Sequence, residues 1–211
     1  TATKHAKAFG FVFIVFSVMR TNQSTEIWSG GIIFVPYKEH HVPKYHEWMK
    51  TPFLQEMTAS EPLSLEDEYQ MQKSWLEDDD KCTFIILEKE AFTTTSNETE
   101  SMIGDVNLFF NNSDNTHEAE IEVMIADPAY RKRGLGKQAI CTMMRYGAET
   151  LHVNTFTAKI KLKNKESIAL FEKLGFILVS TSDIFQRSDI CSRGLTNSKK
   201  TDCERRPGIT S

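Results

Sequence analysis

The sequence predicts an α/β fold with a mixed, mostly antiparallel central sheet flanked by helices. After the first quarter of the chain, strand-like apolar segments alternate with helix-like segments, in which apolar residues recur every three or four positions. An antiparallel meander is followed by the order strand, helix, strand, helix, strand, which is typical of a mixed sheet. With 211 residues and 40% hydrophobic composition, the chain is long enough to form one domain with a full core.

Prolines delimit the first expected elements. Ile32–Tyr37 is predicted to be a strand that Pro36 ends. The stretch 42–59 predicts one or two short helices, because Pro43 suits a helix start and Pro52 interrupts the pattern.

The middle of the chain predicts a capped helix and then an antiparallel meander. Ser64 lies three residues before Asp67, as in a capping box, and predicts a helix over 65–78. Gly104 lies inside an expected strand, where glycine often marks a bulge or a close approach of two backbones. The strands of the meander are expected at 83–90, 102–110 and 119–126, with a polar loop at 92–101 and a hairpin loop at 111–118.

The second half predicts two helices and two strands. A helix is expected over 136–151 and a strand within 155–164. A second helix over 166–174 is stopped by Gly175, and a short strand follows at 176–181.

Both ends of the chain differ from the rest. Ala8–Met19 is apolar but shorter than the about 20 residues that span a bilayer, and no convincing signal cleavage site follows. We therefore expect no membrane segment and interpret residues 1–18 as upstream of a natural start at Met19, with a targeting segment as the alternative. Residues 187–211 show no periodicity and few large apolar residues, which predicts a disordered tail.

Composition excludes some function classes. A net charge of −4 does not favour a nucleic-acid binder. The cysteines are far apart and form no C-x-x-C pair, so no metal site is expected and free thiols of a cytoplasmic protein are the simplest interpretation. They are Cys82, Cys141, Cys191 and Cys203.

The segment Asp127–Ile140, DPAYRKRGLGKQAI, joins an expected strand to an expected helix. Such a junction directs unpaired backbone N–H groups and the positive end of the helix dipole at an anion. Gly134 and Gly136 would let that anion approach the backbone, which suits a diphosphate. The glycine spacing fits neither a P-loop nor a dinucleotide fingerprint, and a nuclear-import signal would not explain the glycines.

The R-x-x-G-x-G pattern after a strand resembles the acyl-coenzyme A signature of the Gcn5-related N-acetyltransferase superfamily. Asn164–Phe176, NKESIALFEKLGF, resembles the second signature of that superfamily, one helix and one strand later. Further stretches, including EIEVMIADP, are similar to the N-acetyltransferase nine family, near the ribosomal-protein N-acetyltransferases. The resemblance covers residues 19–186 and implies a Gcn5-related acetyltransferase domain there.

The resemblance also implies roles for named residues toward acetyl-CoA, without a metal. The backbone from Lys132 to Lys137 would hold the pyrophosphate, and Val123 to Ile125 would pair with the pantetheine arm like an added strand. Asn164 and Ser167 would contact the cofactor from the second junction. The implied cofactor-binding set is Val123, Ile125, Arg131, Lys132, Arg133, Gly134, Leu135, Gly136, Lys137, Asn164 and Ser167.

Glu120 and Glu122 are the candidate catalytic residues, because alternation points both to one face of the strand before the cofactor loop. Glu120 aligns with the base of histone-acetylating relatives. A solvated strand face is the alternative explanation for this pair. Phe171 occupies the position of the tyrosine that many relatives use as general acid, so the acid is not identified.

Three functions stay open at this point. The first is acetyl-CoA-dependent acetylation of a protein amine, an α-amino group above all; the name of the family associates it with tubulin. The second is a catalytically weak acyl-CoA-fold module that binds and stabilises a partner such as microtubules, and the third is acetylation of a small-molecule amine.

The resemblance also predicts a defect at the C-terminus. Family members continue after the SDIFQ-like stretch with another apolar strand, whereas RSDICSRGLTNS stands there in this chain. We therefore expect the last strand to be missing, a sheet edge to be exposed and the stability to be lower than in a full-length relative.

Overall fold

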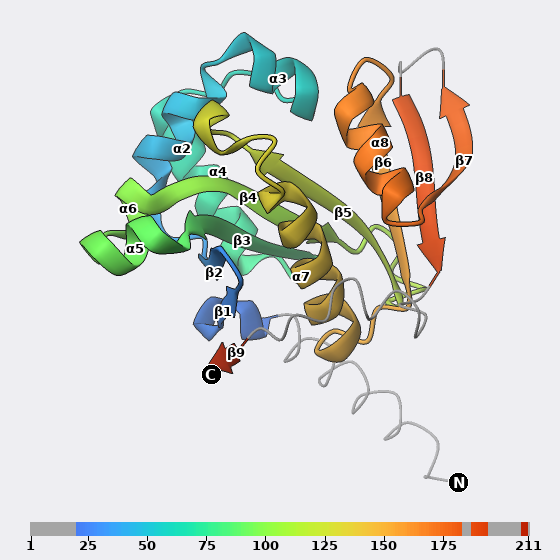
Figure 1. The fold of residues 1–211 in the computed structure, drawn as a ribbon, viewed down its shortest axis with the longest axis horizontal. Coiled ribbons are helices and arrows are strands. Elements are labelled where there is room, and N and C mark those ends of the chain that lie inside the picture. Colours follow the sequence, from blue (N-terminus) through green and yellow to red (C-terminus); the bar gives the residue numbers. More distant parts are fainter. Residues whose placement is uncertain (1–19, 183–186, 194–207, 211) are drawn as a thin grey trace, which may run out of the picture.

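A nine-stranded mixed sheet forms the centre of the protein, and helices cover both of its faces (Figure 1). The computed structural model describes residues 20–182, 187–193 and 208–210; the upstream segment 1–18 and the expected start at Met19 lie outside them. The strands are β1 Glu26–Ser29, β2 Ile32–Pro36, β3 Lys81–Glu88, β4 Met102–Phe109, β5 Glu118–Ile125, β6 Thr155–Lys161, β7 Ile177–Ser182, β8 Arg187–Arg193 and β9 Gly208–Thr210.

The helices connect these strands along the chain. They are α2 Val42–Met49, α3 Pro52–Thr58, α4 Leu65–Glu77, α5 Lys89–Thr95, α6 Glu98–Ser101, α7 Leu135–Glu149 and α8 Lys165–Lys173, with short 3-10 turns η1 Arg20–Ser24, η2 Glu39–His41 and η3 Pro128–Tyr130. Among the described residues, no helix is long and apolar enough to cross a membrane.

The strand order is β7-β8-β6-β5-β4-β3-β2-β1-β9, and only β5 and β6 pair in parallel. This confirms the predicted mixed, mostly antiparallel sheet flanked by helices. Alternation along the strands separates two cores, since successive side chains point to opposite faces. One core packs against α7, and the other lies beneath α2, α3 and α4.

Prolines and caps start the helices as predicted. Pro43 and Pro52 stand in the first turns of α2 and α3, so the stretch 42–59 forms two helices. The Ser64 side chain accepts a hydrogen bond from the backbone N–H of Asp67 at 3.2 Å and caps α4.

The polar stretch 92–101 was predicted to be a loop, and this is wrong. It forms the end of α5 and all of α6, which are started by side chains that cap the helices. The Glu88 carboxylate accepts from the N–H of Ala91, and Asn97 accepts from the N–H of Glu100. Such short helices have little intrinsic stability, so packing against the rest of the fold decides them.

Gly104 is the close approach of two backbones that the sequence predicted. The register between β3 and β4 shifts beside it, and a Cβ atom at this position would overlap the carbonyl oxygen of Met124. The glycine therefore lets β4 pair closely with the end of β5, where the candidate site begins.

The C-terminal prediction was wrong in the described part of the tail. Instead of disorder from Arg187, strand β8 pairs with all of β6 on one side and with β7 on the other, and β9 pairs with β1. The predicted missing strand is therefore present, and β7 forms one edge of the described sheet while β9 forms the other. The reason is a period-two pattern with short residues: Ser188 and Ile190 are buried, while Asp189 is only half-buried.

The packing of β8 can be tested by truncating its buried isoleucine. Ile190→Ala should lower the free energy of unfolding by about 2 to 4 kcal/mol, because it leaves a cavity against the α7 core. Chemical denaturation measures this change. The matched control is Val179→Ala on the neighbouring β7, whose side chain is 65% exposed and should change stability by less than about 0.5 kcal/mol. Equal small effects would mean that β8 does not pack on the core.

Candidate acyl-donor and acceptor site

The two parallel strands at the centre of the sheet separate along their length. β5 and β6 pair only from Glu118 to Glu120 on one side and from Thr155 to Thr157 on the other. Beyond these pairs, β5 continues to Ile125 with its ladder to β4 intact but without pairing to β6. The edge of β5 from Ile121 to Ile125, which includes Val123, thus offers backbone groups to an extended ligand.

The loop after β5 is organised by its own side chains. Asp127 caps the turn η3 by accepting from the N–H of Ala129 at 2.9 Å. The Arg131 guanidinium donates to the carbonyl oxygens of Ile125 and Ala126, at 2.8 and 2.7 Å. Arg131 therefore fixes the loop with two of its five N–H donors, and the remaining donors and the charge stay available for its sequence-predicted role toward the anion.

Six consecutive backbone N–H groups, those of Lys132 to Lys137, donate to no backbone acceptor among the described residues. The first hydrogen bond of α7 runs from the N–H of Gln138 to the carbonyl of Gly134 at 3.0 Å. The row includes Arg133 and Leu135, and it ends at the positive pole of a 15-residue helix. These N–H groups are the donors that the sequence assigned to a pyrophosphate.

The two glycines of this row differ in why the chain needs them. Gly134 has a φ of +81°, in the left-handed region that favours glycine. A Cβ atom at Gly136 would meet only Ile125 and Leu170 at 3.7 and 3.9 Å, which is ordinary van der Waals contact. Neither backbone conformation nor packing therefore requires a glycine at position 136.

The second signature lies beside the first. The Asn164 side chain accepts from the N–H of Ser167 at 3.1 Å and thereby caps α8. Lys132 reaches from the loop to Glu166 in the first turn of α8, with 2.9 Å between nitrogen and oxygen. The fold thus brings both sequence-predicted junctions together, although Asn164 and Ser167 already bond to each other.

Glu120 lies where β5 and β6 begin to separate. It is buried, and its carboxylate accepts from Lys159 at 2.5 Å and from Asn111 at 2.8 Å. An ion pair and a second hydrogen bond occupy this group, which suits a structural role better than proton transfer.

Glu122 projects from the same face of β5 but remains exposed to solvent. Protein atoms crowded around its carboxyl, together with the negative charges of Glu120 and Asp105, raise its pKa to about 7. No hydrogen bond of its side chain is formed within the described residues. A reachable carboxylate that titrates near neutral pH is the form that a general base requires.

Two charged groups near Glu122 were not predicted from the sequence. Lys81 and Asp105 lie on β3 and β4, and both are almost fully buried. For Asp105 the signal is a charge inside an otherwise apolar strand, since such a charge is rarely buried without a function. Lys81 gave no such signal, because it is the first residue of β3 and follows three aspartates.

The sequence has a phenylalanine, Phe171, where many relatives have the tyrosine that serves as general acid, and the structure shows that this side chain cannot take that role. Phe171 is buried and packs edge-to-face on Phe176, with 4.9 Å between ring centroids. This position belongs to the core and offers no proton.

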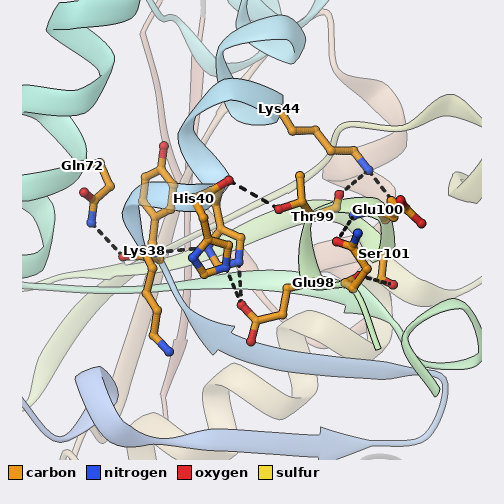
Figure 2. A network of polar contacts seen from close by, with 11 residues as sticks. Lys38, His40, Lys44, Gln72, Glu98, Thr99, Glu100 and Ser101 are labelled. Carbon is orange, nitrogen blue, oxygen red and sulfur yellow. Dashed lines mark hydrogen bonds and ion pairs between the residues drawn. The ribbon is translucent and has the colours of Figure 1, made fainter. Parts of the chain in front are cut away.

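A histidine cluster lies apart from this site, on the segment between β2 and α2. Figure 2 shows His40 beside the Glu98 carboxylate, 2.7 Å from one of its oxygens. Nε2 of His41 lies 2.9 Å from the same oxygen. The N–H of Lys38 donates to Nδ1 of His41, so the proton of this neutral ring lies on Nε2, toward Glu98. Burial lowers the pKa of His41 to about 4. A metal bound at Nε2 would need the opposite tautomer, so the cluster is better explained as a hydrogen-bonded link between η2 and α6.

Comparison with known proteins agrees with this geometry. The model of the acetyltransferase (GNAT) domain matches residues 32–177. The N-acetyltransferase 9-like protein of Nematostella vectensis is 56% identical over 169 residues, which cover 80% of this chain and 85% of that protein. The alpha/beta-tubulin-N-acetyltransferase 9 of Homo sapiens is 50% identical and covers 80% of this chain and 83% of its own length.

Solved structures share the fold at low sequence identity. RimL, a ribosomal L7/L12 alpha-N-protein acetyltransferase in complex with coenzyme A, superposes with a TM-score of 0.66 at 16% identity, covering 80% of this chain and 98% of its own. Domain match, close relatives and fold lead to one conclusion: the chain belongs to the N-acetyltransferase 9 family of GNAT acetyltransferases and is an N-acetyltransferase.

Proposed function

We propose that this enzyme transfers the acetyl group of acetyl-CoA to an α-amino group of a protein, and that Glu122 is its general base. The observation that carries the proposal is the position of Glu122, a solvent-reachable carboxyl with a pKa of about 7, on the strand that opens the sheet. We also expect the enzyme to act in the cytoplasm.

The donor side fits a coenzyme A pyrophosphate and a pantetheine arm. The N–H row of Lys132 to Lys137 would bind the phosphates. The edge of β5 that β6 leaves unpaired would bind the arm at Val123 and at the N–H of Ile125, whose carbonyl already accepts from Arg131. When bound, acetyl-CoA supplies an acetyl group activated as a thioester. Gly136, which nothing in the fold requires, leaves room for the phosphates at the backbone.

The acceptor side fits an α-amine better than a lysine side chain. An α-amino group has a pKa near 8 and a lysine amine near 10.4, and only the neutral amine can attack a carbonyl carbon. Glu122, with a pKa of about 7, is closely matched to the α-amine as a proton acceptor. In the overall exchange the amine nitrogen forms the amide and its proton goes to Glu122. The carbon–sulfur bond breaks, its electron pair stays on sulfur, and coenzyme A leaves as a thiolate that takes a proton from solvent.

Tubulin is the acceptor we propose to test, because relatives at 50% and 47% identity carry it in their names. The alternative, a weakly catalytic module that stabilises microtubules, has one supporting observation: the buried Phe171 provides no general acid.

The decisive experiment combines calorimetry with a transfer assay. Acetyl-CoA should bind, and purified α/β-tubulin should gain acetyl groups at chain N-termini when mass spectrometry is used to locate them. A lysine peptide with a blocked N-terminus serves as the matched acceptor and should remain unmodified. Acetyl-CoA binding without turnover on tubulin or on any N-terminal peptide would support the module, and turnover on the lysine peptide alone would contradict the α-amine assignment.

A further inference from the structure

A row of buried polar side chains crosses the sheet next to Glu122, on the face beneath α2 and α4. The register places Thr83 of β3 opposite Asn107 of β4, and Asn107 opposite Glu122 of β5. Asp105 lies two residues before Asn107, on the same face. Thr83, Asp105 and Asn107 are each at most 5% exposed.

Hydrogen bonds connect this row, with each side chain donating to the next as far as Asp105. The Thr83 hydroxyl donates to the amide oxygen of Asn107 at 2.7 Å, which turns the Asn107 amide nitrogen toward Asp105. That nitrogen donates to Oδ2 of Asp105 at 2.8 Å. The other carboxylate oxygen, Oδ1, is buried and has no hydrogen-bond partner within 3.5 Å, although the Tyr45 hydroxyl is near enough to favour the ionised form. No ion pair within 4 Å neutralises Asp105 among the described residues.

This arrangement is unfavourable for folding. A buried carboxylate with an unsatisfied oxygen costs free energy that a neutral amide at the same position would avoid. The charge of Asp105 is therefore not explained by stability. It is explained by the position of Asp105 beside Glu122, the proposed general base.

Charged or titratable groups face Glu122 from every neighbouring element. The negative ones raise its affinity for a proton, and the positive ones lower it. Lys81 is enclosed by rings: its ammonium lies 2.8 Å from the ring centroid of Trp75 and 4.4 Å from that of Phe109. The facing groups are Glu120 on β5, Asp105 on β4, Lys81 on β3, Lys159 on β6 and Tyr45 on α2.

We propose that Asp105 and Lys81 are positioning residues that never touch substrate and that set, in opposite directions, how strongly Glu122 holds a proton. The proposal rests on the assignment of Glu122 as the base. Asn107 fixes the orientation of Asp105, and the aromatic rings fix that of Lys81. Asp105 and Lys81, buried on neighbouring strands, thereby adjust the proton affinity of the solvent-reachable Glu122 so that it can exchange a proton near neutral pH.

The directions of the titrations agree with this arrangement. Burial raises the pKa of Asp105 to about 6 and lowers the pKa of Lys81 to about 7. Because the pKa of Asp105 is raised by folding, its ionised form weakens the fold once the pH rises through about 6. Removing this charge should therefore cost no stability at pH 7, although it should weaken the base.

The test is a carboxyl-carbon NMR titration of the full chain labelled at glutamate. Asp105→Asn should lower the titration midpoint of Glu122 by about one pH unit. Lys81→Met should raise it by a smaller amount, because Lys81, with a pKa of about 7, is only half charged where Glu122 titrates. Asp114→Asn removes the same charge from the exposed tip of the β4–β5 hairpin and should leave the midpoint unchanged. Glu122→Gln identifies the resonance.

Opposite shifts, together with an Asp105→Asn melting temperature equal to or above that of the wild type, would support the proposal. Unchanged midpoints, or shifts of both variants in the same direction, would overturn it. The titration needs no acceptor, so its result is separate from that of the assay. If Glu122→Gln kept full turnover while the midpoints moved as expected, the general-base assignment would fail and the tuning of Glu122 would stand.

Discussion

Glu122→Gln should reduce the rate of acetyl transfer by about a hundred-fold or more, since a positioned general base contributes roughly 10² to 10⁴ to such reactions. Glutamine keeps the size and polarity of the side chain but cannot accept the proton. The exposed side chain makes no hydrogen bond that the fold depends on, so the melting temperature should change little. Coupled detection of free thiol at saturating acetyl-CoA measures the rate.

The pH dependence of kcat/KM is an independent test of Glu122 as the general base. A base acts when deprotonated, so kcat/KM of the wild type should fall as the pH drops through about 7, the pKa of Glu122. Protonation of the acceptor α-amine, with a pKa near 8, adds its own fall to both enzymes. The wild type should therefore fall with a second proton below about pH 7, and Glu122→Gln should keep only the fall of the amine.

Glu120→Gln is the matched control on the same strand. It disturbs the contacts of Glu120 with Lys159 and Asn111 and should cost stability, while lowering turnover by less than about ten-fold. A large loss in Glu120→Gln together with normal turnover in Glu122→Gln would reverse the assignment and favour the role of Glu120 inferred from histone-acetylating relatives.

Gly136→Val should weaken the binding of coenzyme A by about a hundred-fold or more, the loss expected when two charge-assisted hydrogen bonds to backbone N–H groups are blocked. The backbone tolerates a side chain here, because a Cβ atom at position 136 fits and no left-handed conformation is required. Gly136→Ala, which adds only that Cβ atom, is the variant whose fold should be unchanged. Isothermal calorimetry with coenzyme A measures the dissociation constant, and a melting curve checks the fold.

Arg133→Ala is the comparison for Gly136→Val. Its guanidinium is exposed and lies over the ring of Tyr130, 5.1 Å from the ring centroid, so its loss should weaken binding by no more than about ten-fold. Gly134 is a poorer test position, since its φ of +81° would make any substitution strained. If Arg133→Ala had the larger effect, the loop would act as an electrostatic patch and not as a backbone cradle.

Local patterns were sufficient wherever an element depends on its own residues. Pro43, Pro52 and Ser64 started helices as predicted, because a missing N–H or a capping hydroxyl acts within one turn. Local patterns failed for the stretch 92–101 and for β8, where contacts with distant parts of the chain decide the structure.

By itself, the sequence determined the mixed sheet, the acetyltransferase family and the place of the two junctions, because glycine spacing and strand–loop–helix order are properties of consecutive residues. Only the tertiary structure decided which side chains are available for chemistry there. It bound two of the N–H donors of Arg131 to the loop and paired Glu120 with Lys159. It also left Glu122 open among charges from other strands, because partners and pKa values arise from groups that only folding brings together.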